Sequence, residues 1–382
     1  MLMNTQTNSK SDSRVADWIR VAQAEIPPRK LRPLLEACNH DPTELLRGPA
    51  SRWAQILPGL LDKQASRLHA CARAPVDDAR RAMDAAEAQV IPINDASYPT
   101  NLREISDASP VLFVRGRICQ DDKFSLAIVG SRRATMYGMS IAERFARLLS
   151  ARGLCIVSGG ARGIDSRAHR GALSGGGRTI VFLGCGIDIV YPSENRRLFD
   201  DIVRNDQGAI ISEFAPGVTP EPWRFPARNR LISGMTMGTL VIETPIDSGA
   251  MITASDAAAQ GRDVFAVPGP IETGRSAGCH RLIREGARLV ETPDDIMEEL
   301  GLTRLDFDAS QSMATSGYQA APDDLDDDQR QILDRLTLQP QGVDHLITST
   351  ELRAPQVVAV LTLLEMRGLA RRVPGNAFVR VL

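Results

Sequence analysis

The stretch LCIVSGGARGIDSRAHRGALSGGGRTIVFLG, residues 154–184, decides the fold class. Its two ends, residues 154–159 and 179–184, are short apolar runs that contain several β-branched residues. Between them, a glycine-rich turn leads into a helical pattern over residues 164–174. A buried strand, a helix and a second buried strand form the repeating unit of a parallel sheet.

The same alternation continues on both sides of this stretch. Apolar strands separated by helices are typical of a parallel sheet that is covered on both faces. We therefore predict an α/β fold over residues 76–302, a Rossmann-like doubly wound, mostly parallel sheet. The other predicted strands are 89–93, 111–116, 124–130, 208–213, 238–244 and 263–268, and the other predicted helices are 138–152, 194–204, 227–237 and 249–261.

Different patterns flank the predicted sheet. Residues 1–13 are polar and predicted to be a disordered tail, and residues 14–75 are predicted to be an all-helical domain of the SAM-like or helix-hairpin-helix type. Within it, ILPGLLDKQASRLHA (56–70) resembles half of a helix-hairpin-helix, or is a simple interhelical turn. Residues 303–324 are predicted to be an acidic linker. Three helices and a two-stranded hairpin over residues 325–382 predict a winged-helix domain.

The composition limits the possible partners. The formal net charge is -2, so the whole chain does not attract nucleic acid or anionic membranes, and an anion site must be a local concentration of charge. The six cysteines form no C-x-x-C pair. No apolar stretch reaches membrane-spanning length and the N-terminus has no apolar signal region. We expect a cytoplasmic protein without membrane contact.

The ends of two predicted strands carry glycine- and serine-rich loops. Ligands of open α/β sheets bind at the carboxyl ends of the strands. Such a loop either permits a tight turn or presents backbone amides to a phosphate, and two neighbouring loops favour the anion site. The loop residues are Gly130, Ser131 and Arg132 in the first loop, and Ser158, Gly159, Gly160 and Arg162 in the second.

A third segment, FPARNR (225–230), adds two arginines and an asparagine. Arg228 and Arg230 lie in the first turn of the helix predicted from residue 227, where the helix dipole disfavours a cation unless an anion is bound. With Arg132 and Arg162 they would bind several phosphates, because guanidinium groups pair with phosphate oxygens bidentately. Alternatively, carboxylates neutralise these arginines in a structural network, and both can hold. The candidate carboxylates are Glu213, Glu243 and Asp247, with Glu243 as the orienting carboxylate.

Several common nucleotide-binding motifs are absent from the sequence. It contains no G-x-x-x-x-G-K-[ST] motif and no G-x-G-x-x-G motif, so neither a P-loop NTPase nor an NAD enzyme is expected. None of the five histidines belongs to a recognisable nucleophile–base pair, and His280 is either a stacking ring or a residue at a helix start. We predict no catalytic residues, no metal and no cofactor.

Five motifs together resemble the DprA (Smf) family of DNA-processing proteins, over about residues 88–300. The resemblance implies a Rossmann-type domain that binds single-stranded DNA without cutting it. It also implies protection of incoming DNA, loading of the recombinase RecA during natural transformation, and a homodimer. The motifs are IVGSRRATMYG (128–138), VSGGARGIDSRAH (157–169), FPARNRLISG (225–234), VIETPIDSGAMITASDAAAQGRDVFAVPG (241–269) and GCHRLIREGA (278–287).

The family's DNA contacts carry over to Arg132 in the first loop, to the SGGA loop (158–161), and to Arg228, Asn229 and Arg230. The competing hypothesis is a nucleotide-binding enzyme, a nucleoside-phosphate hydrolase of the lysine-decarboxylase-like fold. Of the signature of that class, only Gly238-Thr239 and Glu243 remain, at altered spacing.

A third hypothesis is a sequence-specific repressor that acts through the winged helix. The candidate recognition helix, residues 354–368, offers Gln356 but no cation before Arg367. This charge pattern is weak support for contact with a duplex, because phosphate contacts need cations.

Overall fold

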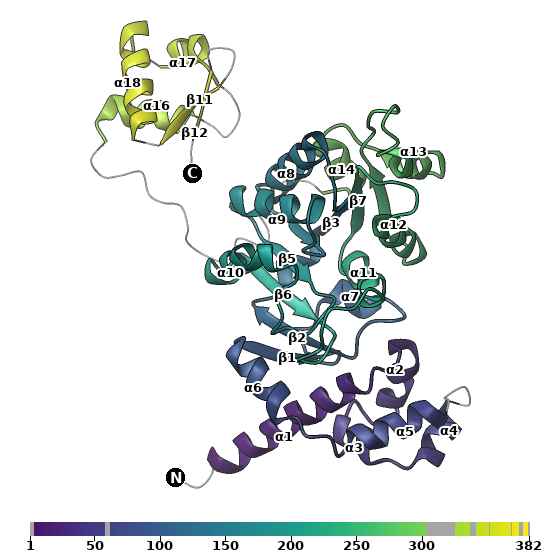
Figure 1. The fold of residues 1–382 in the computed structure, drawn as a ribbon. Coiled ribbons are helices and arrows are strands. Elements are labelled where there is room, and N and C mark those ends of the chain that lie inside the picture. The colour runs from purple at the N-terminus through teal and green to yellow at the C-terminus, as the bar shows by residue number, and fades with distance from the viewer. Residues whose placement is uncertain are drawn as a thin grey trace. The chain divides into compact units, whose positions relative to one another are not determined.

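The chain divides into two compact units, residues 1–310 and 311–382, which are described separately. The computed structural model (Figure 1) describes residues 4–57, 62–302, 325–336, 341–350, 352–367, 369–373 and 377–380. The predicted acidic linker (303–324) and the turn of the possible helix-hairpin-helix (58–61) lie outside the described residues.

The first unit is built on a nine-stranded sheet, counted over the described residues, with the order β1-β2-β6-β5-β4-β3-β7-β8-β9. The strands from β6 to β9 in this order are parallel, whereas β2 pairs antiparallel with both β1 and β6. This arrangement confirms the predicted doubly wound, mostly parallel sheet. The strands are β1 (Ala88–Pro92), β2 (Val111–Gly116), β3 (Ser125–Gly130), β4 (Cys155–Ser158), β5 (Thr179–Phe182), β6 (Gly208–Ser212), β7 (Gly238–Ile242), β8 (Asp263–Ala266) and β9 (Arg288–Leu289).

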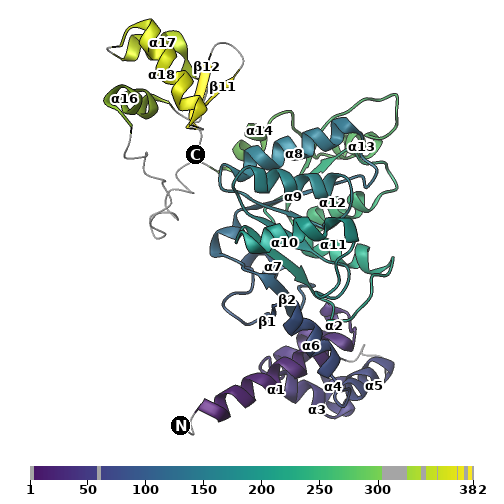
Figure 2. The same ribbon diagram turned by 60° about the vertical axis from the view of Figure 1, so that its left-hand side comes forward.

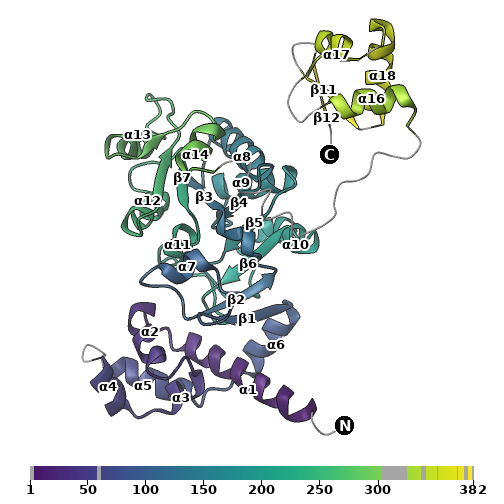
Figure 3. The same cartoon turned by 180° about the vertical axis from the view of Figure 1, so that it is seen from behind.

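Helices cover both faces of the sheet, as Figures 1 and 3 show. Alternate residues of β3 point to opposite faces: Leu126 and Ile128 pack with α8, α9 and α14, whereas Ala127 and Val129 pack with α7, α11, α12 and α13. Burial on both sides explains why the strands are almost purely apolar. The helices are α7 (Thr100–Glu104), α8 (Met136–Ser150), α9 (Ile164–Ser174), α10 (Arg196–Arg204), α11 (Arg224–Gly234), α12 (Gly249–Ala259), α13 (Ala277–Arg284) and α14 (Pro293–Glu299).

The strand order places a topological switch point at the centre of the sheet. From β3 the chain proceeds to β4, β5 and β6 on one side, and then returns to β7, β8 and β9 on the other side. The loops that follow β3 and β7 therefore diverge and leave a crevice at the carboxyl edge, which is where ligands of such sheets bind.

The N-terminal helices are not a separate body. Trp18, Leu34 and Trp53 belong to the same buried cluster as Val111 and Phe113 of β2, so the predicted boundary at 75/76 does not divide two compact units. Figure 2 shows these helices against β1 and β2. The helices are α1 (Asn4–Gln23), α2 (Pro28–Glu36), α3 (Pro42–Arg47), α4 (Ala50–Ile56), α5 (Asp62–Cys71) and α6 (Asp77–Ala85).

Helix α1 begins at Asn4 and therefore covers most of the stretch 1–13 that the sequence predicted as a disordered tail. The second half of α1 packs into the core and stabilises the helix. Residues 4–23 contain neither glycine nor proline, so no residue of the stretch interrupts the helix toward its N-terminus. None of the helices in the described ranges is both long and apolar enough to cross a lipid bilayer.

The second unit has the predicted winged-helix elements around its own apolar core, which includes Ile332, Leu346 and Leu361. A third strand, of two residues, extends the predicted hairpin to a sheet with the order β10-β12-β11. Its described elements are α16 (Asp327–Arg335), β10 (Gln341–Gly342), α17 (Val343–Ser349), α18 (Ala354–Met366), β11 (Ala370–Val373) and β12 (Ala377–Arg380).

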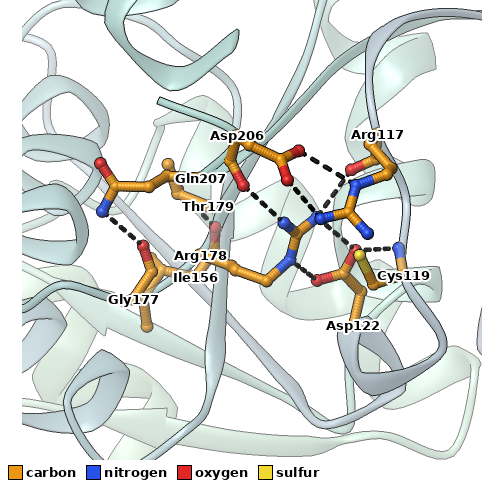
Figure 4. A network of polar contacts seen from close by, with 9 residues as sticks. All are labelled: Arg117, Cys119, Asp122, Ile156, Gly177, Arg178, Thr179, Asp206 and Gln207. Carbon is orange, nitrogen blue, oxygen red and sulfur yellow. Dashed lines mark hydrogen bonds and ion pairs between the residues drawn. The ribbon is translucent and has the colours of Figure 1, made fainter. Parts of the chain in front are cut away.

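The amino edge of the sheet is held together by Arg178, which directly precedes β5 (Figure 4). Its Nε and one Nη donate to the two carboxylate oxygens of Asp122, at 2.7 and 3.0 Å. The same guanidinium donates to the backbone oxygens of Arg117 at 2.6 Å and Asp206 at 3.0 Å. The Asp122 side chain is only 1% exposed, so this ion pair is largely removed from water. The network thus joins four segments of the chain, namely the three that precede β3, β5 and β6 and the one that follows β2.

Candidate nucleic-acid interface

A groove of about 2200 Å³ begins at the carboxyl edge of the sheet, beside the switch point between β3 and β7, and extends along α12 to β8 and β9. Five of the ten residues predicted to contact DNA line it, namely Gly130, Ser131, Arg132, Arg228 and Asn229. The other five do not line it, namely Ser158, Gly159, Gly160, Arg162 and Arg230. The groove therefore follows the first glycine loop and the start of α11 more closely than the second loop.

Glycines allow the loops at this edge to lie very close together. A Cβ atom at Gly130 would lie 2.0 Å from the backbone oxygen of Ile242, and one at Gly163, where φ is +77°, would lie 2.3 Å from that of Ser131. Backbone hydrogen bonds then join the loops: Ser131 N donates to Glu243 O, and Ile164 N donates to Ser131 O. The loops after β3, β4 and β7 thus form one connected floor.

Arg132 and Arg133 are exposed cations on the first loop. The guanidinium carbon of Arg132 lies 5.3 Å from the ring centroid of Phe225, and neither arginine makes an ion pair with a residue that the structure describes. Arg275, which also lines the groove, donates to the backbone oxygen of Arg133 at 2.9 Å and is 48% exposed. These three side chains present positive charge to a ligand.

Arg228 is buried, in contrast to the prediction that it meets the ligand from the first turn of its helix. Because α11 begins at Arg224, Arg228 lies in the second turn and is only 3% exposed. Its guanidinium donates to the backbone oxygens of Gly159, at 3.0 Å, and of Phe182. Burial lowers the pKa of Arg228 to about 10, against the opposing effect of Asp165. Arg228 therefore supports the second glycine loop from beneath.

Asp165 supports the same loop from the N-terminus of α9. Its carboxylate accepts hydrogen bonds from Gly159 N at 3.2 Å and Ala161 N at 3.3 Å. Burial raises the pKa of Asp165, while Arg228 and the two amide donors act in the opposite direction. The loop is thus held by a buried cation and a buried carboxyl group.

The two remaining predicted arginines have carboxylate partners. Arg230 makes two hydrogen bonds to Glu213, at 2.7 and 2.6 Å, and lies 3.5 Å from Asp107. Arg162 is exposed and pairs with Glu194. Arg230 therefore fits the alternative hypothesis, in which carboxylates neutralise the arginines in a structural network. Its side chain pairs with Glu213 and does not line the groove.

Glu243 orients a loop and not the predicted arginines. It is 4% exposed, has a φ of +45°, and accepts hydrogen bonds from Thr135 N at 2.9 Å and from Thr135 Oγ1 at 2.7 Å. The nearest cation is Arg275, at 4.0 Å. Such backbone strain persists only where surrounding contacts fix the residue, and here the contacts fix the first glycine loop at the start of α8. The third candidate carboxylate, Asp247, is exposed and lines the groove.

Two aromatic rings in the groove were missed by the sequence analysis. Tyr191 is 44% exposed, and its ring centroid lies 5.4 Å from that of Phe225. Rings beside cations in a groove are typical of proteins that bind single-stranded nucleic acids, whose bases stack on them. The signal was present as two aromatic residues that each precede a proline at the carboxyl edge. His280 instead contacts the backbone of Gly269, with its Nε2 3.0 Å from the oxygen.

A buried histidine, His169, lies in the middle of α9 and contacts the first residue of β5. The Thr179 hydroxyl donates to Ile156 O at 2.6 Å, so its oxygen accepts from His169 Nδ1, 2.7 Å away. The other ring nitrogen, Nε2, is buried without a partner among the described residues. Burial, with a smaller effect of Arg228, lowers the pKa of His169 from 6.5 to about 3. His169 is therefore neutral in the folded protein.

This pKa makes stability depend on pH. Below pH 6.5 the unfolded chain protonates His169 and the folded chain does not, so the contribution of His169 is complete above pH 6.5 and is lost as the pH falls toward 3. The free energy of unfolding of the wild type should fall as the pH is lowered through this range. We expect His169→Gln to make this fall less steep by about 1.4 kcal/mol per pH unit, as measured by urea denaturation. His345→Gln, at an exposed position, serves as the control. An unchanged pH slope in His169→Gln would contradict the assignment.

Comparison with known proteins identifies the family. A family model described as DNA recombination-mediator protein A matches residues 89–301, and a model of the DprA winged helix domain matches residues 317–376. Protein Smf of Escherichia coli is 37% identical over 85% of this chain and 85% of its own length. DNA processing protein DprA of Streptococcus pneumoniae is 42% identical over 59% of this chain and 78% of its own length.

Solved structures agree with these matches. The DNA processing protein A of Streptococcus pneumoniae has a TM-score of 0.62 and 35% identity, over 73% of this chain and 95% of its own. That of Helicobacter pylori, whose structure concerns its single-stranded DNA binding mode, has a TM-score of 0.50 and 27% identity over 56% of this chain and 95% of its own. From the matched sheet domain, the winged helix and these relatives, we conclude that the chain belongs to the DprA (Smf) family of DNA-processing proteins.

Proposed function

We propose that this chain binds single-stranded DNA without catalysis, protects incoming strands and loads RecA onto them in natural transformation. The carrying observation is the groove at the switch point, where the exposed Arg132, Arg133 and Arg275 lie with the rings of Tyr191 and Phe225. The Helicobacter pylori relative, which binds single-stranded DNA, supports the proposal.

The chemistry of the groove favours a single strand over a duplex. Arginines neutralise phosphates of either form, but stacking on Tyr191 and Phe225 needs bases that are not already stacked and paired. The strand would thus be recognised by its backbone charge and by its exposed bases, with little dependence on sequence.

The position of Glu243 argues against the competing hydrolase hypothesis. In that hypothesis the carboxylate acts on a nucleotide. Here it is buried, and both of its oxygens accept hydrogen bonds from Thr135. A carboxylate occupied in this way holds a loop and is poorly placed to meet a substrate. We therefore favour binding without turnover.

The homodimer and the RecA contact belong to the proposal as well. An apolar surface supports self-association at the edge of the sheet, where Leu289 of the short edge strand β9 is 44% exposed. A second copy would pair with β9 itself, because an edge strand with an exposed apolar side chain is typical of protein interfaces.

The salt dependence of binding tests the assignment of the arginines. If Arg132 and Arg133 each neutralise one phosphate, either alanine variant should reduce the slope of log affinity against log salt by about 0.7. Arg132→Lys should restore part of the affinity, because lysine keeps the charge but loses the bidentate fork. The measurement is a titration of a fluorescent oligothymidine at several salt concentrations.

Arg170→Ala, which removes an exposed arginine of α9 outside the groove lining, is the matched control and should leave the slope unchanged. Wild-type slopes in well-folded Arg132→Ala and Arg133→Ala would remove these residues from the site. Equal affinity of the wild type for single strands and duplexes would reject the proposed function.

A further inference from the structure

One tryptophan of this chain is exposed. The chain has three tryptophans, all within the described residues. Trp18 is 4% exposed and Trp53 is fully buried, whereas Trp223 is 52% exposed. Trp223 belongs to the segment PEPWRFP (220–226), which leads from the loop after β6 into the first turn of α11, and it directly precedes that helix. An indole is a large apolar surface, so its exposure at a fixed position suggests a ligand.

Three contacts hold the Trp223 ring in place. Its Nε1 donates to a carboxylate oxygen of Glu221 at 2.6 Å. The ring of Phe214 meets it edge-on, with centroids 6.4 Å apart and planes at 88°. The guanidinium carbon of Arg224 lies 4.6 Å from its centroid. The ring is therefore fixed before any ligand arrives, which lowers the entropic cost of binding.

Arg224 acts here through stacking more than through hydrogen bonds. Its side chain is 8% exposed and lies over the rings of both Trp223 and Phe214. Its Nε and Nη1 have no hydrogen-bond partner among the described residues. Only Nη2 meets carboxylates, Glu25 at 2.9 Å and Glu221 at 3.6 Å. A guanidinium placed over an indole is held there by a cation–π interaction, so Arg224 helps to fix the ring.

The ring adjoins the groove. Pro222 and Phe225, on either side of Trp223 and Arg224 in the chain, both line it, as does Pro220. Phe225 in turn lies beside Tyr191. The two carboxylates that meet Arg224 have their charge offset by its guanidinium, so they oppose a passing strand less than free carboxylates would.

We propose that Trp223 is a further stacking site for a nucleobase, occupied by a strand that leaves the groove past Phe225. This inference rests on the proposed function and extends it by one base position. The ligand is a single-stranded nucleic acid, because the ring continues the aromatic and cationic lining of the groove. Stacking on a rigid ring is tolerant of sequence, since every base has an aromatic face.

Intrinsic fluorescence tests this proposal directly, since Trp223 is the exposed one of the three tryptophans. We expect oligothymidine to quench the emission of the full chain and to protect it from acrylamide. Trp223→Phe should abolish this response while largely keeping affinity. Trp223→Ala should weaken binding roughly 5- to 150-fold, the range measured for the loss of one base–aromatic stack. Leu363→Ala, which removes a 45% exposed apolar side chain from the winged-helix unit, is the control and should bind as the wild type.

The outcomes separate this inference from the proposed function. If oligothymidine shifts the wild type in a gel while its fluorescence is unchanged and Trp223→Ala binds normally, the stacking site is rejected and the proposed function stands. If the wild type binds no single strand at all, both are rejected. Quenching that persists in Trp223→Phe would assign the signal to a buried tryptophan and would also reject the site.

Discussion

Replacement of Arg228 by alanine is expected to lower the free energy of unfolding by about 2 to 6 kcal/mol, at about 1 to 3 kcal/mol for each buried hydrogen-bonding group that is left without its partner. The variant leaves the oxygens of Gly159 and Phe182 without their donor and Asp165 without its nearby cation. The loss is large compared with a typical total stability of about 5 to 15 kcal/mol. The midpoint of urea denaturation measures it.

Arg132→Ala is the matched control for this experiment, because Arg132 lies on the same groove but is exposed. It should change the unfolding free energy by less than about 0.5 kcal/mol and should weaken DNA binding. A wild-type midpoint in Arg228→Ala, with a reduced salt slope of binding, would show that Arg228 serves the ligand and not the loop.

Arg178→Ala is expected to cost a similar amount, about 3 to 5 kcal/mol, because Asp122 would remain buried without its cation. The backbone oxygens of Arg117 and Asp206 would also lose a donor. Since the network lies at the amino edge of the sheet, the folded fraction should bind single-stranded DNA with wild-type affinity and salt slope. Denaturation and DNA titration of the same preparation measure both quantities.

A double variant that removes both charges distinguishes the energy of the Arg178–Asp122 ion pair from a general loss of packing. Arg178→Met combined with Asp122→Leu should recover part of the lost stability, because no buried charge is then left unpaired. If the double variant is as unstable as the sum of the two single variants, the two side chains do not interact energetically. That result would contradict the role assigned to the network.

The sheet was largely predictable from sequence because burial on both faces makes its strands apolar and glycine marks their ends. The predicted bounds of β2 and α9 agree with the structure. The predicted start of α11 is three residues late, since Pro226 suggests a first helical position but occupies the third. The two-residue strands β9 and β10 carry no periodicity and could not be found.

The meeting of the loops at the groove was predictable, but the direction of each side chain of the candidate site was not. The carboxyl ends of parallel strands share one edge, so the glycine loops had to meet there. Whether an arginine faces solvent depends on partners that are distant in sequence. Asp107 lies close to Arg230 only after folding, and Tyr191 meets Phe225 in the same way.

The central position of β3 also sets the order in which this protein becomes able to bind during synthesis. Leu126 of β3 pairs with Gly238 of β7, so one wall of the crevice is translated long before the other. At roughly 5 to 20 residues per second, the ribosome needs about 5 to 20 seconds to complete the second wall. No nascent fragment that ends before β7 contains the groove. If the groove is the DNA site, we therefore expect a half-made chain not to hold single strands there, so that DNA is engaged only by molecules whose sheet has closed.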